Sequence, residues 1–477
     1  MCRRRSSWSD PIAREGLRAD IPGMNRRGLL LASSGVLAAP ALASAQGLSS
    51  GGLQAQQGTS VAGGWRLDVL ARWGDPVLSD APAWAPNAPD ADAVSAQFGW
   101  DAELLAVFTP PRATDGVPRA VVAVAHPGVD PAMAYPDGRD RPDVSAAMQG
   151  VSIINLEKRG RAWVLSSGGY QSRHLGARTL CRADGPAAEQ LGGAINGIYG
   201  AGAGCGTADR LLLAESEASD WTNRLPGRIT AAQGWVVEVN PFEPSDIPVK
   251  RTALGRAPQA IAAQVSPEGK LVVYLAHQTG LARFVSAEAA TSPDALAAGT
   301  LSAARFNGAD VTWAPLGADA WQDLPAALAQ AGARPLPAGA SLAIVADALV
   351  VGAPGQGATG LRGVVDTSRV TSLLPAGMAP GLSALTGDQR GQLWIGNDAG
   401  YGYSSTVMTP DGRPALVMPR GARVGGLGLS PDGAALFTCI RTPGAEPGRS
   451  YSRPATRWPD FTPGTPPRSA LVAIERG

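Results

Sequence analysis

Cysteine and histidine, the usual thiolate and imidazole ligands of transition metals, are scarce in this sequence. The 477 residues include four cysteines and three histidines: Cys2, Cys181, Cys205, Cys439, His126, His174 and His277. No two cysteines have the Cys-x-x-Cys spacing of structural zinc sites, so we expect no such site. One disulfide is possible in an oxidising compartment, and the sequence leaves open which two of Cys181, Cys205 and Cys439 would form it.

The N-terminus carries the pattern of a secretory signal. Arg26 and Arg27 precede an apolar run that ends at Leu42, and residues 43–45 (Ala-Ser-Ala) form a small-residue cleavage site. The run is short and Pro40 interrupts it, which is typical of a twin-arginine signal rather than a membrane span. A buried helix is the less favoured alternative. We therefore expect periplasmic or secreted localisation, a signal region with an N-terminal extension at 1–45, a flexible leader at 46–64 and a single domain at 65–477.

Composition favours an all-β protein. The chain has 60 glycines and 40 prolines, about a fifth of its residues, against roughly 12% in average proteins. Such turn-rich composition with short apolar runs is typical of many-stranded folds. Lys and Arg (41) nearly balance Asp and Glu (40), so charge favours neither nucleic acid nor an anionic membrane surface as a partner.

Strand patterns recur along the chain. We predict strands at Glu103–Phe108, within 120–124 and at Gly150–Leu156, the last paired as a hairpin with residues 161–166. Four tight turns with glycine at the position that needs positive φ, Gly269, Gly391, Gly412 and Gly433, each precede an apolar strand. These repeated units predict a β-propeller, with a sandwich as the alternative, and we expect the four glycines at equivalent positions in different blades. Residues 319–334 are expected to add a helix, and 442–467 a long proline-rich loop.

The most distinctive stretch is residues 234–256, GWVVEVNPFEPSDIPVKRTALGR. Trp235, Val237 and Val239 alternate with other residues as in a strand, and Asn240-Pro241 ends it. This string closely resembles the signature of PhoX-type alkaline phosphatases, a secreted metal-dependent family. Further blocks resemble the family in the same order: VLARWGDPV and AQFGW near the start, DGPAA (184–188), GTLSAARFNGADVTWAPL (299–316), GQLWIGNDAG (391–400) and GLGLSPDGAALFTCIRTPG (426–444).

The resemblance implies a six-bladed propeller and, in active members, iron and calcium ions at one mouth of its channel. Most of the implied ligand positions carry other residues here. Ala125-His126-Pro127 replaces Asn-His-Glu, Gln149-Gly150 replaces His-Gly, and Ala214 stands at the iron-binding thiolate position. The implied His-Glu-Gly falls on residues 259–261 (Gln-Ala-Ile), and an acidic pair falls on residues 277–278 (His-Gln).

Some positions keep a usable side chain. The resemblance makes Glu215, Asp398 and His126 candidate metal ligands and Arg362 a candidate phosphate-binding residue, although Arg362 is slightly out of register. Each has a structural alternative: Glu215 as a solvated carboxylate at a blade end, Asp398 as a turn cap, and His126, which precedes a proline in a loop, as a structural residue. Cys205 is a weaker candidate to replace the lost thiolate. His174 has no partner near it in sequence and is expected at the surface.

Three functions remain open at this point. The chain is expected to bind a small phosphorylated or other ligand, or a partner, at the propeller mouth without hydrolysing phosphate esters. The alternatives are an active metal-dependent phosphatase with a reduced site, holding calcium and iron if the family site is partly retained, and an exported structural propeller. The missing motifs favour the first and third over the second, because losing several ligands abolishes tight binding of a metal cluster. No cofactor is assigned.

Overall fold

A computed structural model describes residues 53–111, 115–216, 219–225, 227, 230–362, 367–375 and 377–477. The expected signal region, 1–45, and the first residues of the expected leader lie outside the described residues. All described residues belong to one compact unit of the chain, Ala39–Gly477. In the described parts of the chain, no helix is long and apolar enough to cross a membrane.

The described strands form five hydrogen-bonded sheets, three of which hold the strands between Glu103 and Leu374. The first consists of β3 (Glu103–Phe108), β4 (Arg119–His126), β5 (Gly150–Arg159) and β6 (Ala162–Leu165), with β7 (Arg173–Leu175) on β5. The second runs β10 (Ala203–Gly206), β11 (Leu211–Ala214), β12 (Val236–Val239), β13 (Val249–Arg251), β8 (Leu180–Asp184) and β9 (Ala194–Asn196). The third runs β14 (Ala260–Val265), β15 (Lys270–His277), β16 (Gly280–Ala289), β17 (Gly299–Asn307), β18 (Asp310–Pro315), β22 (Thr367–Leu374), β21 (Gly357–Arg362), β20 (Ala348–Ala353) and β19 (Ser341–Val345).

Two further sheets hold the end of the chain together with its first strands. One runs β23 (Leu382–Gly387), β24 (Leu393–Asn397), β25 (Thr406–Met408), β26 (Pro414–Val417) and β1 (Ser60–Val61). The other runs β27 (Arg423–Leu429), β28 (Ala435–Arg441), β29 (Ala470–Arg476) and β2 (Trp65–Arg72). Neighbouring strands are antiparallel except β13 and β8, which are parallel.

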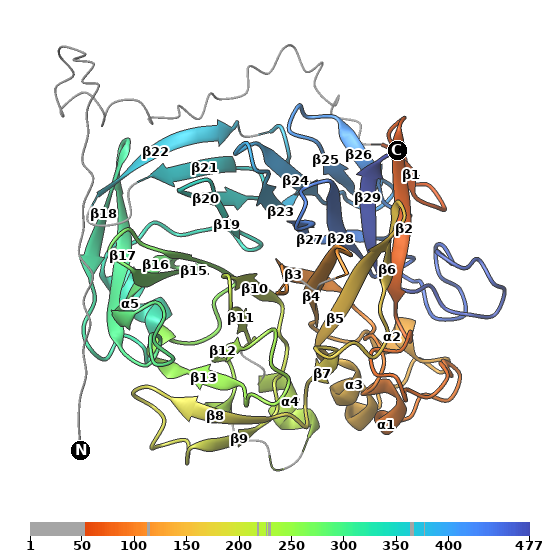
Figure 1. The fold of residues 1–477 in the computed structure, drawn as a ribbon, viewed down its shortest axis with the longest axis horizontal. Coiled ribbons are helices and arrows are strands. Elements are labelled where there is room, and N and C mark those ends of the chain that lie inside the picture. The colour runs from red at the N-terminus through yellow and green to blue at the C-terminus, as the bar shows by residue number, and fades with distance from the viewer. Residues whose placement is uncertain are drawn as a thin grey trace, which may run out of the picture. The chain divides into compact units, whose positions relative to one another are not determined.

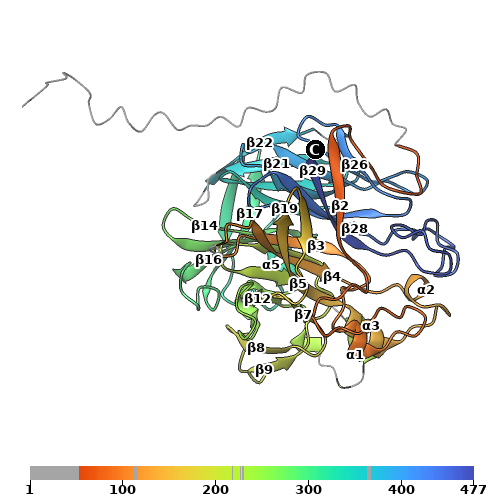
Figure 2. The same cartoon turned by 45° about the vertical axis from the view of Figure 1, so that its right-hand side comes forward.

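The sheets are arranged as in a propeller. The edge strands β3, β10, β14, β19, β23 and β27 each contact the next in this order, and β27 contacts β3. Figure 1 shows β3, β10, β19, β23 and β27 facing one another around the centre of the fold, and Figure 2 labels β14. This closed cycle favours the six blades that the family resemblance implies. Because β18 pairs with β22 and thereby joins two blades into one sheet, the blade number stays a prediction.

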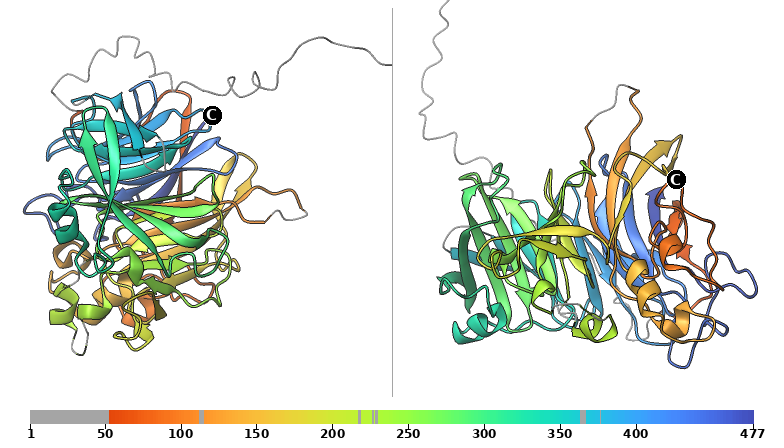
Figure 3. Two further views of the ribbon diagram at one scale, coloured as in Figure 1. Left: turned by 90° about the vertical axis from the view of Figure 1, so that its left-hand side faces the viewer. Right: turned by 90° about the horizontal axis from the view of Figure 1, so that it is seen from below.

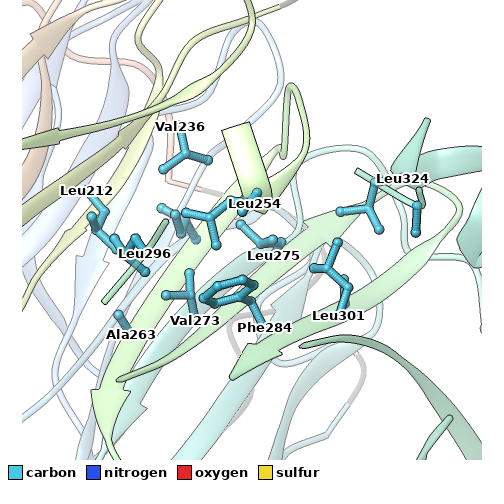
Figure 4. Packing of buried hydrophobic residues seen from close by; sticks show 14 of the residues in the cluster. Leu212, Val236, Leu254, Ala263, Val273, Leu275, Phe284, Leu296, Leu301 and Leu324 are labelled. Carbon is cyan, nitrogen blue, oxygen red and sulfur yellow. The ribbon is translucent and has the colours of Figure 1, made fainter. Parts of the chain in front are cut away.

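Apolar clusters fill the spaces between neighbouring sheets. One joins Leu212 and Val236 of the second sheet to Val273, Leu275 and Phe284 of the third, all with at most trace exposure (Figure 4). Full burial of such a side chain stabilises the fold by about 1.5–3 kcal/mol. Five other clusters of buried residues occupy the remaining contacts around the cycle.

The N-terminal strands complete the last sheets. β2 pairs antiparallel with β29, the last strand of the chain, from Trp65 opposite Arg476 to Arg72 opposite Ala470 (Figure 2). β1 pairs with β26, and Gln54 and Gln56 make single bridges to Tyr403 and Pro419. The expected flexible leader therefore differs from the structure, in which the segment from Gln54 to Val61 already pairs with the domain.

The helices lie at one end of the channel. Because the strands alternate in direction, each innermost strand begins, and each second strand ends, at the same end, called here the N-terminal mouth. The helices sit mainly in connections at this end and gather on one side of the sheets (Figure 3): α1 (Ala91–Val94), α2 (Pro131–Ala134), α3 (Pro142–Met148), α4 (Ser219–Arg224) and α5 (Leu324–Gln330). α5 confirms the helix expected within 319–334.

The four turn glycines all have positive φ, between 67° and 78°. Gly269, Gly391 and Gly433 precede β15, β24 and β28, which are second strands of three different blades. The prediction of equivalent positions is wrong for Gly412, which lies between β25 and β26 in the same sheet as Gly391. The turn residues specify the same local backbone in both places, and they carry no information on the order of strands within a blade.

Candidate functional site at the N-terminal mouth

The topology brings charged side chains from distant parts of the chain to the N-terminal mouth. Glu103 begins β3, Arg423 begins β27, Arg441 ends β28 and Asp398 directly follows β24. All four line a cavity of about 620 Å³ that also touches each of the six innermost strands. A second cavity of about 600 Å³ adjoins it, and Arg423 and Arg441 line both.

Arg441 is the centre of an ion network. Its Nη2 and Nε lie 2.6 and 3.0 Å from the two carboxylate oxygens of Asp101, and its Nη1 donates to Glu103. Burial raises the pKa of Glu103 to about 7, although the Arg441 guanidinium opposes that shift. Burial disfavours the charged Arg441, yet Asp101 and Glu103 outweigh it and raise the pKa of this arginine. The network therefore holds one permanent cation between two acids, one of which titrates near neutrality.

Asp398, a candidate metal ligand, lies at this mouth. Its Oδ1 accepts a 2.8 Å hydrogen bond from the backbone N–H of Val424. Burial raises the pKa of the Asp398 carboxyl, and the Val424 amide and the nearby Arg423 and Arg441 counteract that rise. The hydrogen bond ties the residue after β24 to the start of β27, so Asp398 has a structural role between two sheets rather than the turn cap that was the alternative for it.

Glu215, the second candidate, is fully buried and not solvated. Lys250, also fully buried, places its Nζ 2.9 Å from both carboxylate oxygens, and the backbone N–H groups of Tyr199 and Trp235 donate to them at 3.0 and 3.2 Å. Burial raises the pKa of Glu215, and Lys250 opposes the shift. Both oxygens thus have protein donors, and the expectation of a solvated carboxylate is wrong.

His126, the third candidate, is also fully buried. Its Nδ1 contacts the carbonyl oxygen of Asp101, while its Nε2 lies 2.9 Å from Ser152 Oγ and 3.3 Å from the Gly99 N–H. Both ring nitrogens are therefore engaged. Burial lowers the pKa of His126 to about 3, with a smaller contribution from His174.

His174 is not the surface residue that we expected. Its ring is partly buried and stacks against His126 at 5.9 Å between ring centroids. Its Nε2 lies 3.1 Å from the carbonyl oxygen of Gln149, and its Nδ1 lies 3.3 Å from Ser152 Oγ. The two partners of His174 are Ser152 on β5 and Gln149, the residue directly before β5. No local sequence pattern indicates these contacts.

Arg362 and Cys205 lie apart from these groups. Arg362 ends β21, on the outer side of its blade, and its Nη2 lies 3.6 Å from Asp347. Cys205 lies on β10 and lines the 620 Å³ cavity, where burial raises the pKa of its thiol to about 12. Cys181, Cys205 and Cys439 are all free thiols in this structure.

The positions that lack the implied ligands are integrated into the fold. Ala214 is buried and pairs with Ala203 and Val236 across the second sheet. Gln149 is buried, donates to the carbonyl oxygens of Ala146 and Ile198 and accepts from the Gly200 N–H. Gln259 donates to Pro337, and Ala260 and Ile261 are buried.

Sequence comparison identifies the family. Residues 52–353 match the family model described as alkaline phosphatase PhoX. The chain belongs to the PhoX family. No curated protein matches.

Comparison with solved structures agrees with this fold. Pseudomonas fluorescens PhoX in complex with vanadate, a transition state analogue, superimposes with a TM-score of 0.76 at 22% identity, covering 89% of this chain and 97% of that chain. A gluconolactonase-like structure matches with a TM-score of only 0.31 at 12% identity over 77% of this chain and 93% of that chain. At these identities the likeness to PhoX concerns the fold, and the second match carries no argument.

The residues of this PhoX-family chain do not fit the iron and calcium site that the family resemblance implies. Among the described residues, no group of three or more His, Cys, Asp and Glu side chains is placed to hold a metal ion. Glu215 and His126 use their polar atoms within the protein, and no group of metal ligands forms around Cys205 among the described residues. Glu215, Asp398 and His126 are thus not brought together as one ligand set.

Sequence reasoning missed the charged residues that the mouth does bring together: Asp101, Glu103, Arg423 and Arg441. Arg441 stands within the family-like block 426–444, and Arg423 stands three residues before it. Charged residues at the first position of an innermost strand or the last of a second strand would have been the signal, because in a propeller these positions converge.

Proposed function

We propose that this PhoX-family protein is exported, binds a small ligand at the N-terminal mouth, and does not hydrolyse phosphate monoesters. The observation that supports the absence of hydrolysis is that both carboxylate oxygens of Glu215 already accept hydrogen bonds within the protein. A carboxylate that accepts hydrogen bonds from Lys250 and two backbone amides has no free oxygen lone pair directed at a metal without breaking a buried ion pair. Ligand binding is supported by the two adjoining cavities, whose size is typical of small-molecule sites.

The experiment measures metal content and turnover on protein purified from the periplasm. We expect substoichiometric iron and calcium, and p-nitrophenyl phosphate turnover at the buffer rate between pH 6 and 10, with or without both metals. Metallophosphatases lower the reaction barrier by well over ~10 kcal/mol and metal charge supplies much of that, so loss of the cluster leaves background rates rather than a modest defect.

A reduced but active metal site is the second candidate, supported by family membership and by the position of Asp398 at the mouth. The control variant is Asp398→Asn, which keeps an acceptor for the Val424 amide. Metal-dependent turnover in the wild type that this variant abolishes would establish the second candidate and refute the first. Export is tested separately: replacing Arg26 and Arg27 by lysine should retain the protein in the cytoplasm, whereas continued export would indicate another route.

A further inference from the structure

Two arginines stand directly opposite each other at the N-terminal mouth. In the antiparallel pair β27–β28, the register places Arg423 against Arg441. Directly opposed side chains lie on the same face with Cβ atoms about 5 Å apart, and like charges in this position repel. Such a pair is stable when anionic groups lie between or beside the two guanidinium groups.

The two arginines differ in what neutralises them. Arg441 is bound by Asp101 and Glu103. Arg423 has an exposed side chain that makes no hydrogen bond or ion pair to any residue that the structure describes. Asp398 lies near enough to interact with it electrostatically but does not bind its guanidinium donors. Its guanidinium therefore offers a planar set of donors that matches a carboxylate or phosphate.

The acids around the adjoining 600 Å³ cavity are already engaged. Asp101 accepts from Arg441 through both oxygens. Glu446 accepts from Arg420 at 2.8 Å and lies 4.0 Å from Arg449, and Asp130 accepts from the first turn of α2. A cation entering this cavity would compete with these bonds, whereas an anion meets Arg423, whose hydrogen-bond donors have no partner among the described residues.

The same cavity has an aromatic rim. Tyr401 and Tyr403, in the connection from β24 to β25, are 65% and 46% exposed, and both line the cavity together with Trp100 and Met133. Exposed aromatic faces beside a free guanidinium are suited to a ring that carries an oxyanion.

We propose that this cavity binds a small organic anion with a planar ring, its phosphate or carboxylate group on Arg423 and its ring against Tyr401 and Tyr403. The inference rests on the proposed function, because it names the ligand class of the same mouth. The two anionic groups share the bidentate oxyanion chemistry that Arg423 recognises, and the probes below separate them.

The test is titration calorimetry of the full mature protein with phenylphosphonate, benzoate, inorganic phosphate and uncharged benzyl alcohol. We expect phenylphosphonate or benzoate to bind and benzyl alcohol not to bind, and the stronger of the two anions identifies the preferred group. Arg423→Gln should weaken binding at least about 10-fold, the usual effect of losing a charge-assisted hydrogen bond. Tyr401→Ser with Tyr403→Ser should weaken the aryl anions about 3- to 10-fold and leave inorganic phosphate unchanged.

The matched control is Arg390→Gln, an exposed arginine in the turn between β23 and β24 at the opposite end of the channel. It should bind all probes as the wild type does, and thermal melting of each variant confirms that it is folded. Equal binding by Arg423→Gln and Arg390→Gln, or no binding of either aryl anion, would overturn the inference. Neither result would bear on hydrolysis, since turnover of p-nitrophenyl phosphate in the parallel assay is what refutes the proposed non-hydrolytic function.

Discussion

Glu215 and Lys250 form a fully buried ion pair, and such pairs stabilise a fold only while both partners are present. Desolvating each charge costs several kcal/mol, which the mutual attraction and added hydrogen bonds offset. Lys250 Nζ also donates to the carbonyl oxygen of Ala232 at 2.8 Å, and Glu215 accepts from two amides. The pair therefore joins β11, β12 and β13 at the N-terminal mouth.

We predict that Glu215→Ala lowers the free energy of unfolding by about 3–5 kcal/mol, because it leaves the Lys250 ammonium buried without a counter-charge. The double variant Glu215→Leu with Lys250→Met should recover a large part of this loss. Denaturant unfolding of the three proteins measures both effects. Asp411→Ala, which breaks the exposed pair with Arg413, is the control and should cost less than about 1 kcal/mol. A single variant as stable as this control would show that water reaches the site.

Two buried groups predict opposite pH dependences. His277 is buried, and burial lowers its pKa to about 4, so between pH 6.5 and 4 the unfolded chain binds a proton that the folded protein does not. Its contribution to stability is therefore lost as the pH falls. Burial raises the pKa of Glu103 to about 7, so its contribution is present at low pH and is lost as the pH rises through 7.

We expect His277→Gln to reduce the loss of unfolding free energy between pH 7 and pH 5 by about 2 kcal/mol. Glu103→Gln should enlarge the same loss by a similar amount, because the opposing contribution of Glu103 is gone. Both variants keep the groups that interact electrostatically with Glu103, which are Asp101, Asp398, Arg441 and Cys439. Chemical unfolding at the two pH values tests this, and shifts of the same sign in both variants would disprove it.

The sequence was enough to name candidate site residues, but it did not show which residues each of them contacts. The sequence offered a structural alternative for each candidate ligand. His126 and Asp398 have partners within the fold, whereas the alternative for Glu215, a solvated carboxylate, is wrong because the residue is fully buried. The sequence did not reveal the partner of Glu215, because Lys250 lies 35 residues away on β13 and nothing local links them. Contacts between blades, such as that of Arg441 with Glu103, cannot be predicted without knowing how the sheets are arranged around the cycle.

At the scale of elements, local patterns predicted strands well and pairing order poorly. Glu103–Phe108 and the hairpin of β5 and β6 match the structure, since alternating apolar residues and tight turns are local properties. The parallel pairing of β13 with β8 and the placement of Gly412 in the same sheet as Gly391 depend on how distant segments meet.

Two glycines with similar backbone geometry should respond differently to alanine. Gly426, on β27 with φ of 70°, faces β3, and a Cβ there would lie 2.1 Å from the carbonyl oxygen of Leu104. Gly412, with φ of 78°, has open space around the same position. We predict that Gly412→Ala costs about 1–2 kcal/mol from backbone strain alone. Gly426→Ala should cost about 3 kcal/mol or more, because β27 and β3 must also separate. Thermal unfolding tests the ranking, and equal losses would mean that the contact between β27 and β3 adapts freely.

At the scale of the whole molecule, the cycle of sheets is completed by strands from the two ends of the described chain. β2 contributes Leu70 and Ala71 to the apolar cluster shared with β3, β4 and β28, and it covers the edge of β29. An unpaired β29 would expose backbone donors and acceptors that promote association between chains. The leader segment containing β1 adds only two paired residues to β26.

These differences predict unequal effects of two N-terminal deletions. Removing the chain through Gly64 should leave a folded protein with a slightly lower melting temperature. Removing it through Trp73 should abolish cooperative unfolding and cause aggregation. Trp65 lies opposite Arg476, and the Gly477 N–H donates to the Gly64 carbonyl at 2.7 Å, so β2 can follow β29 through a tight turn. Appending residues 65–73 after Gly477 with an Asn-Gly turn should therefore restore folding, whereas a scrambled segment should not. Size-exclusion chromatography and thermal melting distinguish these variants, and cooperative melting of the longer deletion without the appended strand would show that the remaining sheets close without β2.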